Sequence, residues 1–126
     1  MLERVFADHD LTIDTVVAQA FDYFRRCLQS DGSIAEDPSV DVFQEWDSVN
    51  ALKAIALWQK RLPSESGEVI DALLGFLSGR EKPTGMLSWG ALEIADDEYC
   101  TETSSEYVHA LSLLGCEESA RRKAEF

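Results

Sequence analysis

The chain has 126 residues, of which 45% are hydrophobic and 28% are charged, so we expect one globular domain around a single core. Its 24 acidic and 11 basic residues give a formal net charge of -13, which repels a phosphate backbone and excludes nucleic acid as an expected partner. The 3 cysteines lack a CxxC spacing and no segment has the roughly 20 apolar residues of a membrane span, which favours a cytoplasmic protein without disulfides.

An apolar series from Leu11 to Leu28 recurs at intervals of three and four residues and predicts the first helix. Asp10 stands before this series as the expected N-cap, because its carboxylate can accept an unpaired backbone N–H. Ser30 to Ser33 then interrupt the pattern around Gly32, which favours a turn.

Two further apolar series predict the second and third helices. The second runs from Phe43 to Trp58 and is expected to end near Leu62, because Pro63 disfavours helical geometry in the residue before it. The third runs from Val69 to Leu77 and is expected to end at Ser78-Gly79.

The last third of the chain carries a more broken pattern. Met86 to Ile94 predicts one or two helical turns packed on the core. Thr103 to Glu106 has the form of a capping box, which predicts the start of a fourth helix that ends at Leu114 with Gly115 as its C-cap. Glu117 to Phe126 predicts the start of one more helix.

The helices form an internal repeat of two helical hairpins, about residues 11–62 and 65–115. Phe24 to Gly32 matches Leu77 to Gly85 at an offset of 53 residues. Val49 to Ile55 matches Val108 to Leu114 at an offset of 59, so the second hairpin carries six extra residues around 96–101. About three such repeats are usually needed for stability. We therefore expect a homo-oligomer or a longer parent chain.

The turn of the first hairpin also resembles that of a known family. Gln29 to Ser33 follow an aromatic helix end at Tyr23-Phe24, and the second hairpin has Gly85 and Trp89 at similar places. This pattern resembles the repeats of squalene cyclases and protein prenyltransferases. The resemblance implies an all-α fold of helical hairpins of the α/α toroid type. Six hairpins close that barrel and two are present here, so it implies an incomplete barrel.

The inserted residues Asp96 to Cys100 are the sharpest candidates for chemistry. Protein prenyltransferases bind zinc through Asp, Cys and His, so the resemblance implies a zinc site of Asp97, Cys100 and His109. The family spaces its Asp and Cys two residues apart, whereas Asp97 and Cys100 are three apart. A surface acidic loop without any cofactor is the simpler alternative.

The same acidic residues allow two other interpretations. Asp96 and Asp97 resemble part of the catalytic acid motif of the class II terpene cyclases, in which a carboxylic acid protonates an alkene, but Ile94 replaces its first Asp. Asp96, Asp97 and Glu98 also offer the hard oxygen ligands that suit Mg²⁺ and a diphosphate. Few basic residues stand near them to help hold phosphates.

Aromatic residues are the candidate ligand-binding side chains. Trp46, Trp89, Tyr99 and Tyr107 could line an apolar concavity, although aromatic residues at helical spacing are usually part of a core. The leading hypothesis is a cyclase-like or prenyltransferase-like repeat domain that binds an apolar or isoprenoid-like small molecule as part of a larger assembly.

Two other functions remain open from the sequence. The first is a noncatalytic module that binds another protein through the apolar ends of an open hairpin array. The second is a carbohydrate-active α/α toroid, in which Asp97 and Glu102 act as acid and base beside stacking aromatic residues.

Overall fold

A computed structural model describes residues 12–35, 44–88 and 100–124 of the protein. Within these ranges the chain is helical and has no strand, which confirms the predicted all-α class. The helices are α2 Ile13–Cys27, α3 Gln44–Trp58, the short 3-10 helix η1 Gln59–Arg61, α4 Ser66–Arg80, α5 Thr101–Leu113 and α6 Glu117–Ala124. None of the helices described is both long enough and apolar enough to cross a bilayer.

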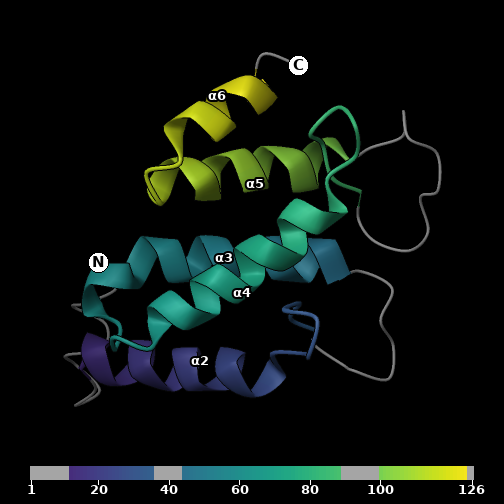
Figure 1. Ribbon diagram of the computed structural model, residues 1–126. Coiled ribbons are helices and arrows are strands. Elements are labelled where there is room, and N and C mark those ends of the chain that lie inside the picture. The colour runs from purple at the N-terminus through teal and green to yellow at the C-terminus, as the bar shows by residue number, and fades with distance from the viewer. Residues whose placement is uncertain (1–11, 36–43, 89–99, 125–126) are drawn as a thin grey trace.

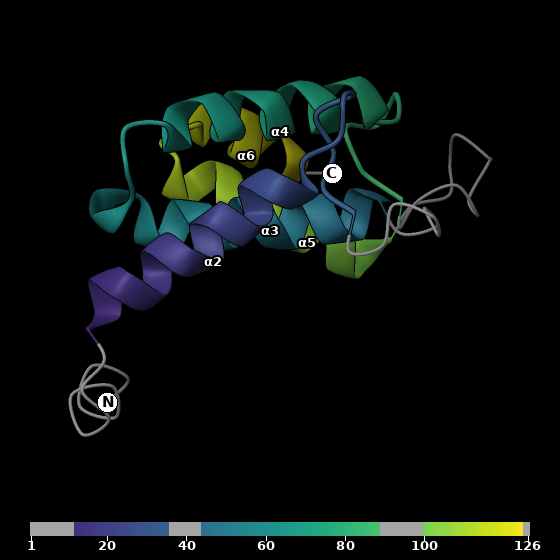
Figure 2. The ribbon, with the colours of Figure 1, turned by 90° about the horizontal axis from the view of Figure 1, so that it is seen from below.

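The helices alternate in direction, so that α3 and α5 run one way while α2 and α4 run the other (Figure 1). α3 is central, because it packs against α2, α4 and α5. Seen from below, α4 and α6 lie on one side of the molecule and α3 and α5 on the other (Figure 2). The first helix of the second hairpin, α4, therefore packs on the second helix of the first, α3, and α6 packs on α5 in the same manner.

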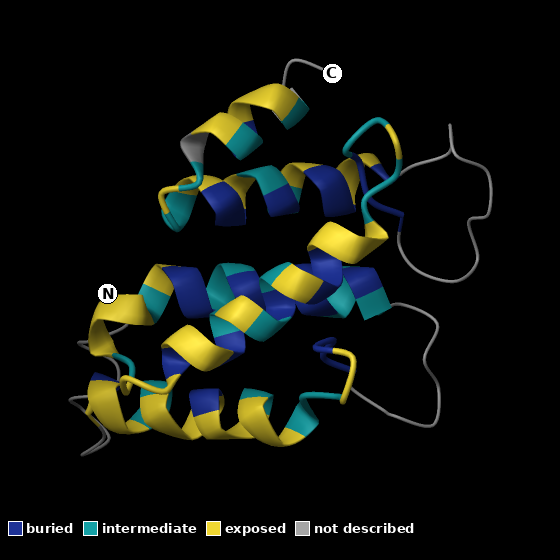
Figure 3. Cartoon of the chain, viewed as in Figure 1, coloured by how far each residue is buried: buried dark blue, intermediate teal, exposed yellow. Residues whose placement is uncertain are grey.

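The core surrounds α3, which buries side chains over most of its circumference. Val49 and Leu52 on this helix have no exposed surface, and Leu73 and Leu77 on α4 are equally inaccessible. The buried residues of α3 and α5 face one another, whereas the outer sides of α2, α4 and α6 are exposed (Figure 3). Burial of these large apolar side chains, each contributing about 2 kcal/mol, is what holds the two hairpins together.

The first helix begins later than its sequence predicts. Thr12, and not Asp10, is the N-cap of α2, with its hydroxyl accepting the backbone N–H of Thr15 at 3.1 Å. Both residue types are good N-caps, so local preference alone does not choose between them. α4 also departs from its prediction, because it continues through Gly79 to Arg80.

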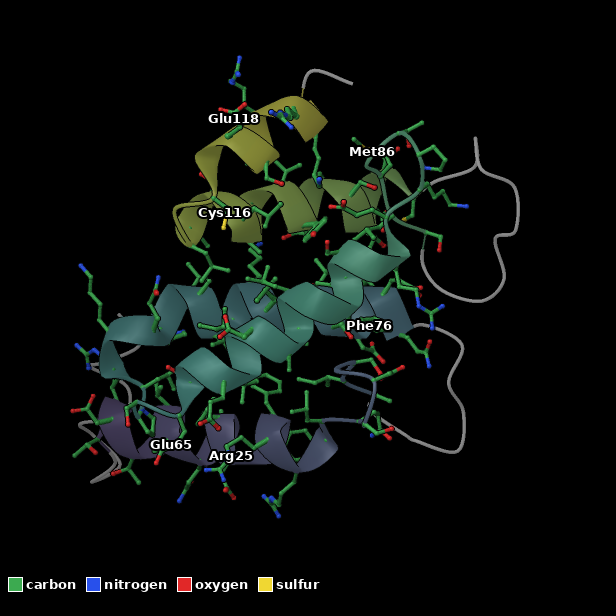
Figure 4. All side chains as sticks on the ribbon, viewed as in Figure 1. Arg25, Glu65, Phe76, Met86, Cys116 and Glu118 are labelled. Atoms are coloured by element: carbon green, nitrogen blue, oxygen red, sulfur yellow. The ribbon has the colours of Figure 1, made fainter. Side chains whose placement is uncertain are left out.

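The two ends of α5 have opposite outcomes. At its start, the predicted capping box is wrong, because Thr103 lies inside the helix and Cys100 is the N-cap. The Sγ of Cys100 accepts the backbone N–H of Thr103. Its end confirms Gly115 as the residue that terminates the helix, with φ +80°. Gly115 donates to Ser112 and Cys116 donates to Leu111, the paired bonds of a Schellman motif. Cys116 lies at the turn into α6 (Figure 4).

The turns that follow α2 and α4 have the same backbone pattern. Both helices have 15 residues, and their ends differ by 53 positions. Gln29 N donates to Ser33 O and Gly32 N donates to Gln29 O in the first turn. Lys82 N and Gly85 N make the corresponding bonds in the second. In this second turn, Met86 to Ser88 are not helical, so the helical turn predicted from Met86 onwards does not form there.

A buried serine ties each turn to the next helix. Ser48 Oγ on α3 accepts the N–H of Ile34 at 3.0 Å and donates to its carbonyl at 3.5 Å. Ser104 Oγ on α5 makes the same two contacts with Leu87, at 3.0 and 3.2 Å. The two serines are 56 residues apart in the sequence, which sets the match between α3 and α5 at 56 and not at the predicted 59.

The glycines of the two turns are equivalent in backbone but not in surroundings. Gly32 has φ +91° and Gly85 has φ +84°. Residues other than glycine rarely adopt this left-handed backbone conformation. A Cβ on Gly32 would lie 2.4 Å from the backbone oxygen of Ala72 on α4, whereas one on Gly85 would lie 3.6 Å from Lys123 Cγ on α6. Only the first turn requires glycine for close packing as well as for its dihedral angle.

We therefore expect Gly32→Ala to destabilise the protein more than Gly85→Ala. The left-handed conformation costs about 1 kcal/mol at either position, and the clash with α4 adds about 2 kcal/mol at Gly32. Urea denaturation followed by circular dichroism measures both variants. Equal losses of unfolding free energy would show that α4 does not rest on the first turn as described.

Candidate functional site

The candidate site is a hollow between α2 and the C-terminal half of α3, referred to below as the α2–α3 hollow. Its volume is about 230 Å³. Among the described residues, ten side chains of apolar or aromatic type line it: Ile13, Val16, Val17, Ala20, Phe21 and Phe24 from α2, Ala54, Ile55 and Trp58 from α3, and Leu62 after η1. Ala20 is exposed, so the hollow is open to solvent on one side.

The hollow exists because α2 lacks the packing that its counterpart α4 has. With the offset of 53 residues, Ala20 corresponds to Leu73 and Phe24 to Leu77. Both leucines are wholly buried, whereas Ala20 is exposed and Phe24 is half-buried. A small side chain and a missing neighbour together leave apolar surface open on α2.

Charged residues stand at one end of the hollow. Arg61 on η1 lies between two lining residues in sequence, and its guanidinium carbon is 6.0 Å from the centre of the Trp58 ring. Its Nη1 is 3.4 Å from Oδ1 of Asp14 in the first turn of α2. This ion pair joins the two walls of the hollow, and because both side chains are exposed it adds little to stability.

A second group of polar side chains joins α4, α5 and α6 on the opposite side of the fold. Tyr107 Oη donates to Glu81 Oε1 at 3.0 Å, and Lys123 Nζ lies 2.6 Å from the same oxygen. Lys123 also lies 5.5 Å from the centre of the Tyr107 ring. Burial, and then the negative charge of Glu81, raise the pKa of Tyr107 well above its usual value. The group is a structural contact that fastens α6, since its charges are paired within the protein.

The predicted ligand-binding aromatics lie apart from the hollow. Tyr107 is buried in the core against α6, and Trp46 is half-buried near the start of α3. Neither residue lines the hollow, where Trp58 is the aromatic side chain of α3. The two other predicted members, Trp89 and Tyr99, lie outside the described residues.

The predicted zinc ligands are not brought together where the structure describes them. Cys100 is buried at the start of α5 and caps the helix, whereas His109 is exposed. Nine residues of helix separate them, or about 13 Å along the helix axis. Asp97 lies outside the described residues. Within the described part of the chain, no cluster of three His, Cys, Asp or Glu side chains has the arrangement of a metal site.

The predicted catalytic acids cannot be placed relative to the hollow. Asp96, Asp97 and Glu98 fall in the segment 89–99, which the structure does not describe. Glu102, the suggested partner in a carbohydrate-active site, is an exposed residue of the first turn of α5. The catalytic, magnesium and carbohydrate hypotheses therefore stay predictions from the sequence.

Sequence reasoning identified the apolar stripe of α2 but assigned no binding site to it. The signal that distinguishes the hollow is a comparison of the two hairpins at an offset of 53 residues, which puts Ala20 where the second hairpin has Leu73. When equivalent positions of two repeats carry a large apolar side chain in one repeat and a small one in the other, the two repeats are packed differently at that position.

No family model, curated protein or solved structure matches the chain. The contacts described above are therefore what supports a function for this protein.

The raised pKa of Tyr107 predicts a dependence of stability on pH. A tyrosine whose pKa is higher in the folded state stabilises the protein below its unfolded-state value of about 10, and this stability is lost as the pH rises further. Between about pH 9 and pH 11, the free energy of unfolding of the wild type should fall by about 1 kcal/mol more than that of Tyr107→Phe.

Urea denaturation at each pH measures this difference. The control is the same comparison between about pH 6 and pH 8, where a tyrosine is protonated in both the folded and the unfolded state, so the wild type and Tyr107→Phe should show the same dependence on pH there. If Tyr107→Phe also keeps the dependence of the wild type, the phenol does not occupy the buried, acidic environment described for it.

Proposed function

We propose that the protein is a helical-hairpin repeat domain that binds an apolar chain, acyl or isoprenoid-like, in the α2–α3 hollow. The ligand class agrees with the resemblance of its turns to the cyclase and prenyltransferase repeats. The α/α toroid type is part of this proposal, with the two hairpins as a portion of a larger assembly. The proposed site lies within the first hairpin and not in a central space enclosed by several hairpins.

The observation that supports the proposal is the composition of the hollow. The ten described side chains that line it are all apolar or aromatic; nine come from the helices α2 and α3, and the tenth, Leu62, follows η1. Ligand pockets in proteins are mostly apolar and largely preformed. A volume of about 230 Å³ is below the usual range for drug-sized ligands, which favours a thin, flexible chain over a fused ring system.

The chemistry beside the hollow favours binding over catalysis. Among the residues that the structure describes, its lining has no carboxylate, imidazole, thiol or hydroxyl group that could act as an acid, base or nucleophile. The neighbouring ionisable side chains described at its rim, Asp14 and Arg61, are paired with each other and exposed. We infer that the domain holds or presents an apolar chain and does not itself transform it.

Filling the hollow should abolish binding. Ala20→Leu places the side chain of its counterpart Leu73 into the space, so an uncharged dye such as 1-N-phenylnaphthylamine should lose at least about tenfold in affinity. Dye fluorescence in the folded protein measures binding. The protein should stay folded, because Ala20 is exposed and the larger side chain can extend into the open hollow without displacing a core residue.

Ala18→Leu is the matched control. Ala18 is an exposed residue on the outer face of the same helix, where it lies beside Asp14, Asp22 and Arg26. This variant adds an identical side chain without entering the hollow, so the dye should bind as it does to the wild type. Loss of binding in both variants, or in neither, would contradict the proposed site.

A second function, binding of another protein, is favoured by two exposed side chains. Among the residues described, Tyr23 and Leu57 are large hydrophobic residues with 49% and 55% of their surface exposed. Uncovered apolar surface on soluble proteins marks interfaces when it is continuous. Tyr23 lies on α2 and Leu57 on α3, so such a module would use the first hairpin, although neither residue lines the hollow.

Analytical ultracentrifugation over a range of concentrations tests the self-associating form of this second function. If the first hairpin is an interface, the protein dimerises and Leu57→Asp shifts it to the monomer, because a buried carboxylate is strongly disfavoured. Lys60→Gln, at an exposed neighbouring position, lowers the net charge by the same single unit and is the control for the change of charge. A monomer at all concentrations would exclude self-association through this face.

A further inference from the structure

A second hollow lies further along the groove between α2 and α3. Its volume is about 260 Å³. The described residues that line it include Cys27 at the end of α2, Ile34 after the turn, and Asn50 and Ala51 on α3. Because α2 and α3 run in opposite directions, the end of α2 lies beside the first half of α3 (Figure 1). The second hollow and the α2–α3 hollow therefore follow one another along the same groove.

Phe24 stands between the two hollows. Among the described residues, it is the only one that lines both of them. Along α2, the lining of the α2–α3 hollow ends at Phe24, and that of the second hollow continues to Cys27. Along α3, residues between 54 and 58 line the α2–α3 hollow, and residues between 47 and 51 line the second. The ring of Phe24 is therefore the wall at which the α2–α3 hollow ends.

The Phe24 ring is held in place by its neighbours. It is half-buried and packs against the core, and the centre of the Tyr23 ring lies 6.4 Å from its own. Protein interiors are close-packed, so a ring that leaves such a place loses contacts that solvent does not replace. A flexible chain that enters the α2–α3 hollow is therefore expected to stop at this ring and not to displace it.

The space in front of the ring suits a chain of medium length. Taking about 30 Å³ for each group of the size of a water or a methylene, the α2–α3 hollow of about 230 Å³ holds about eight groups. The second hollow has a similar volume, so a chain that reached it could be nearly twice as long.

We propose that Phe24 sets the length of the apolar chain that the protein binds, because its ring closes the α2–α3 hollow and keeps the chain out of the second hollow. The ligand is then a medium-length chain, and the further carbons of a longer chain stay in solvent. This inference rests on the proposed function and adds the length of the ligand to it.

Titration of the folded protein with octanol and with dodecanol, by displacement of 1-N-phenylnaphthylamine, tests the length. Each methylene that enters an apolar site raises affinity about fourfold. The wild type should bind the two alcohols with affinities within about threefold of each other, because the last carbons of dodecanol find no apolar contact. The ratio of the two affinities within one variant does not depend on how tightly that variant binds the dye.

Removal of the ring should change this ratio. Phe24→Ala joins the two hollows, so dodecanol should bind at least about tenfold more tightly than octanol. Phe24→Leu, which carries the residue type of its counterpart Leu77, should give a smaller shift in the same direction. Circular dichroism checks that each variant is folded, and the leucine variant keeps the test available if the alanine variant is not.

Two further variants are matched controls. Val17→Ala widens the side of the α2–α3 hollow without opening its end, so it should keep the ratio of the wild type. Cys27→Phe adds a ring to the second hollow alone, so it should also keep this ratio. Combined with Phe24→Ala, it blocks the space that the alanine opens, and the preference for dodecanol should be lost.

The outcomes separate this inference from the proposed function. If the wild type binds dodecanol at least about tenfold more tightly than octanol, and Ala20→Leu binds neither, the hollow is an apolar site that does not end at Phe24. An unchanged ratio in folded Phe24→Ala and Phe24→Leu would overturn the role of Phe24. A preference for dodecanol that survives Cys27→Phe in the double variant would overturn the role of the second hollow. If neither alcohol nor the dye binds to the wild type, the proposed function itself is wrong.

Discussion

Each hairpin of the protein depends on one serine hydroxyl that ties the turn after the first helix to the second helix. Ser48 bonds both backbone groups of Ile34, and Ser104 does the same for Leu87. Unpaired buried backbone groups are costly, so these contacts fix the path of the chain as it returns from the turn. Because this path is fixed, α4 can lie directly on the glycine of the first turn, where a Cβ would be too close.

The hollow follows from the way in which these hairpins pack. The first helix of the second hairpin rests on the second helix of the first, and α6 repeats that contact on α5. Within the described part of the chain, α2 has no helix in the corresponding place. Its apolar face is therefore only partly covered by α3, and Ala20 is exposed where the equivalent residue of α4, Leu73, is buried. The site is thus a consequence of the repeat and of one small residue.

The candidate site was predictable only in part. An apolar ligand was expected from the resemblance of the turns, but the aromatic residues chosen for it were Trp46 on α3, Tyr107 on α5, and Trp89 and Tyr99, which lie outside the described residues. Tyr107 fits a site as well as Trp58 does in sequence, since both are aromatic residues on helices. Only the tertiary structure shows that Tyr107 is buried beneath α6 and hydrogen-bonded to Glu81, whereas Trp58 lines the hollow.

The sequence by itself determined the all-helical class, the approximate place of each helix and the glycine that ends α5. These features depend on the spacing of apolar residues and on backbone angles, which are properties of a few consecutive residues. It did not determine the caps, because Asp10 and Thr12 are both good N-cap residues for α2, and Cys100, the N-cap of α5, is not a residue type that local preference favours there. The tertiary structure decided the offset of 56 residues and the face of α2 that stays open. Both depend on which helices meet, and contacts between distant segments leave no periodic trace in the chain.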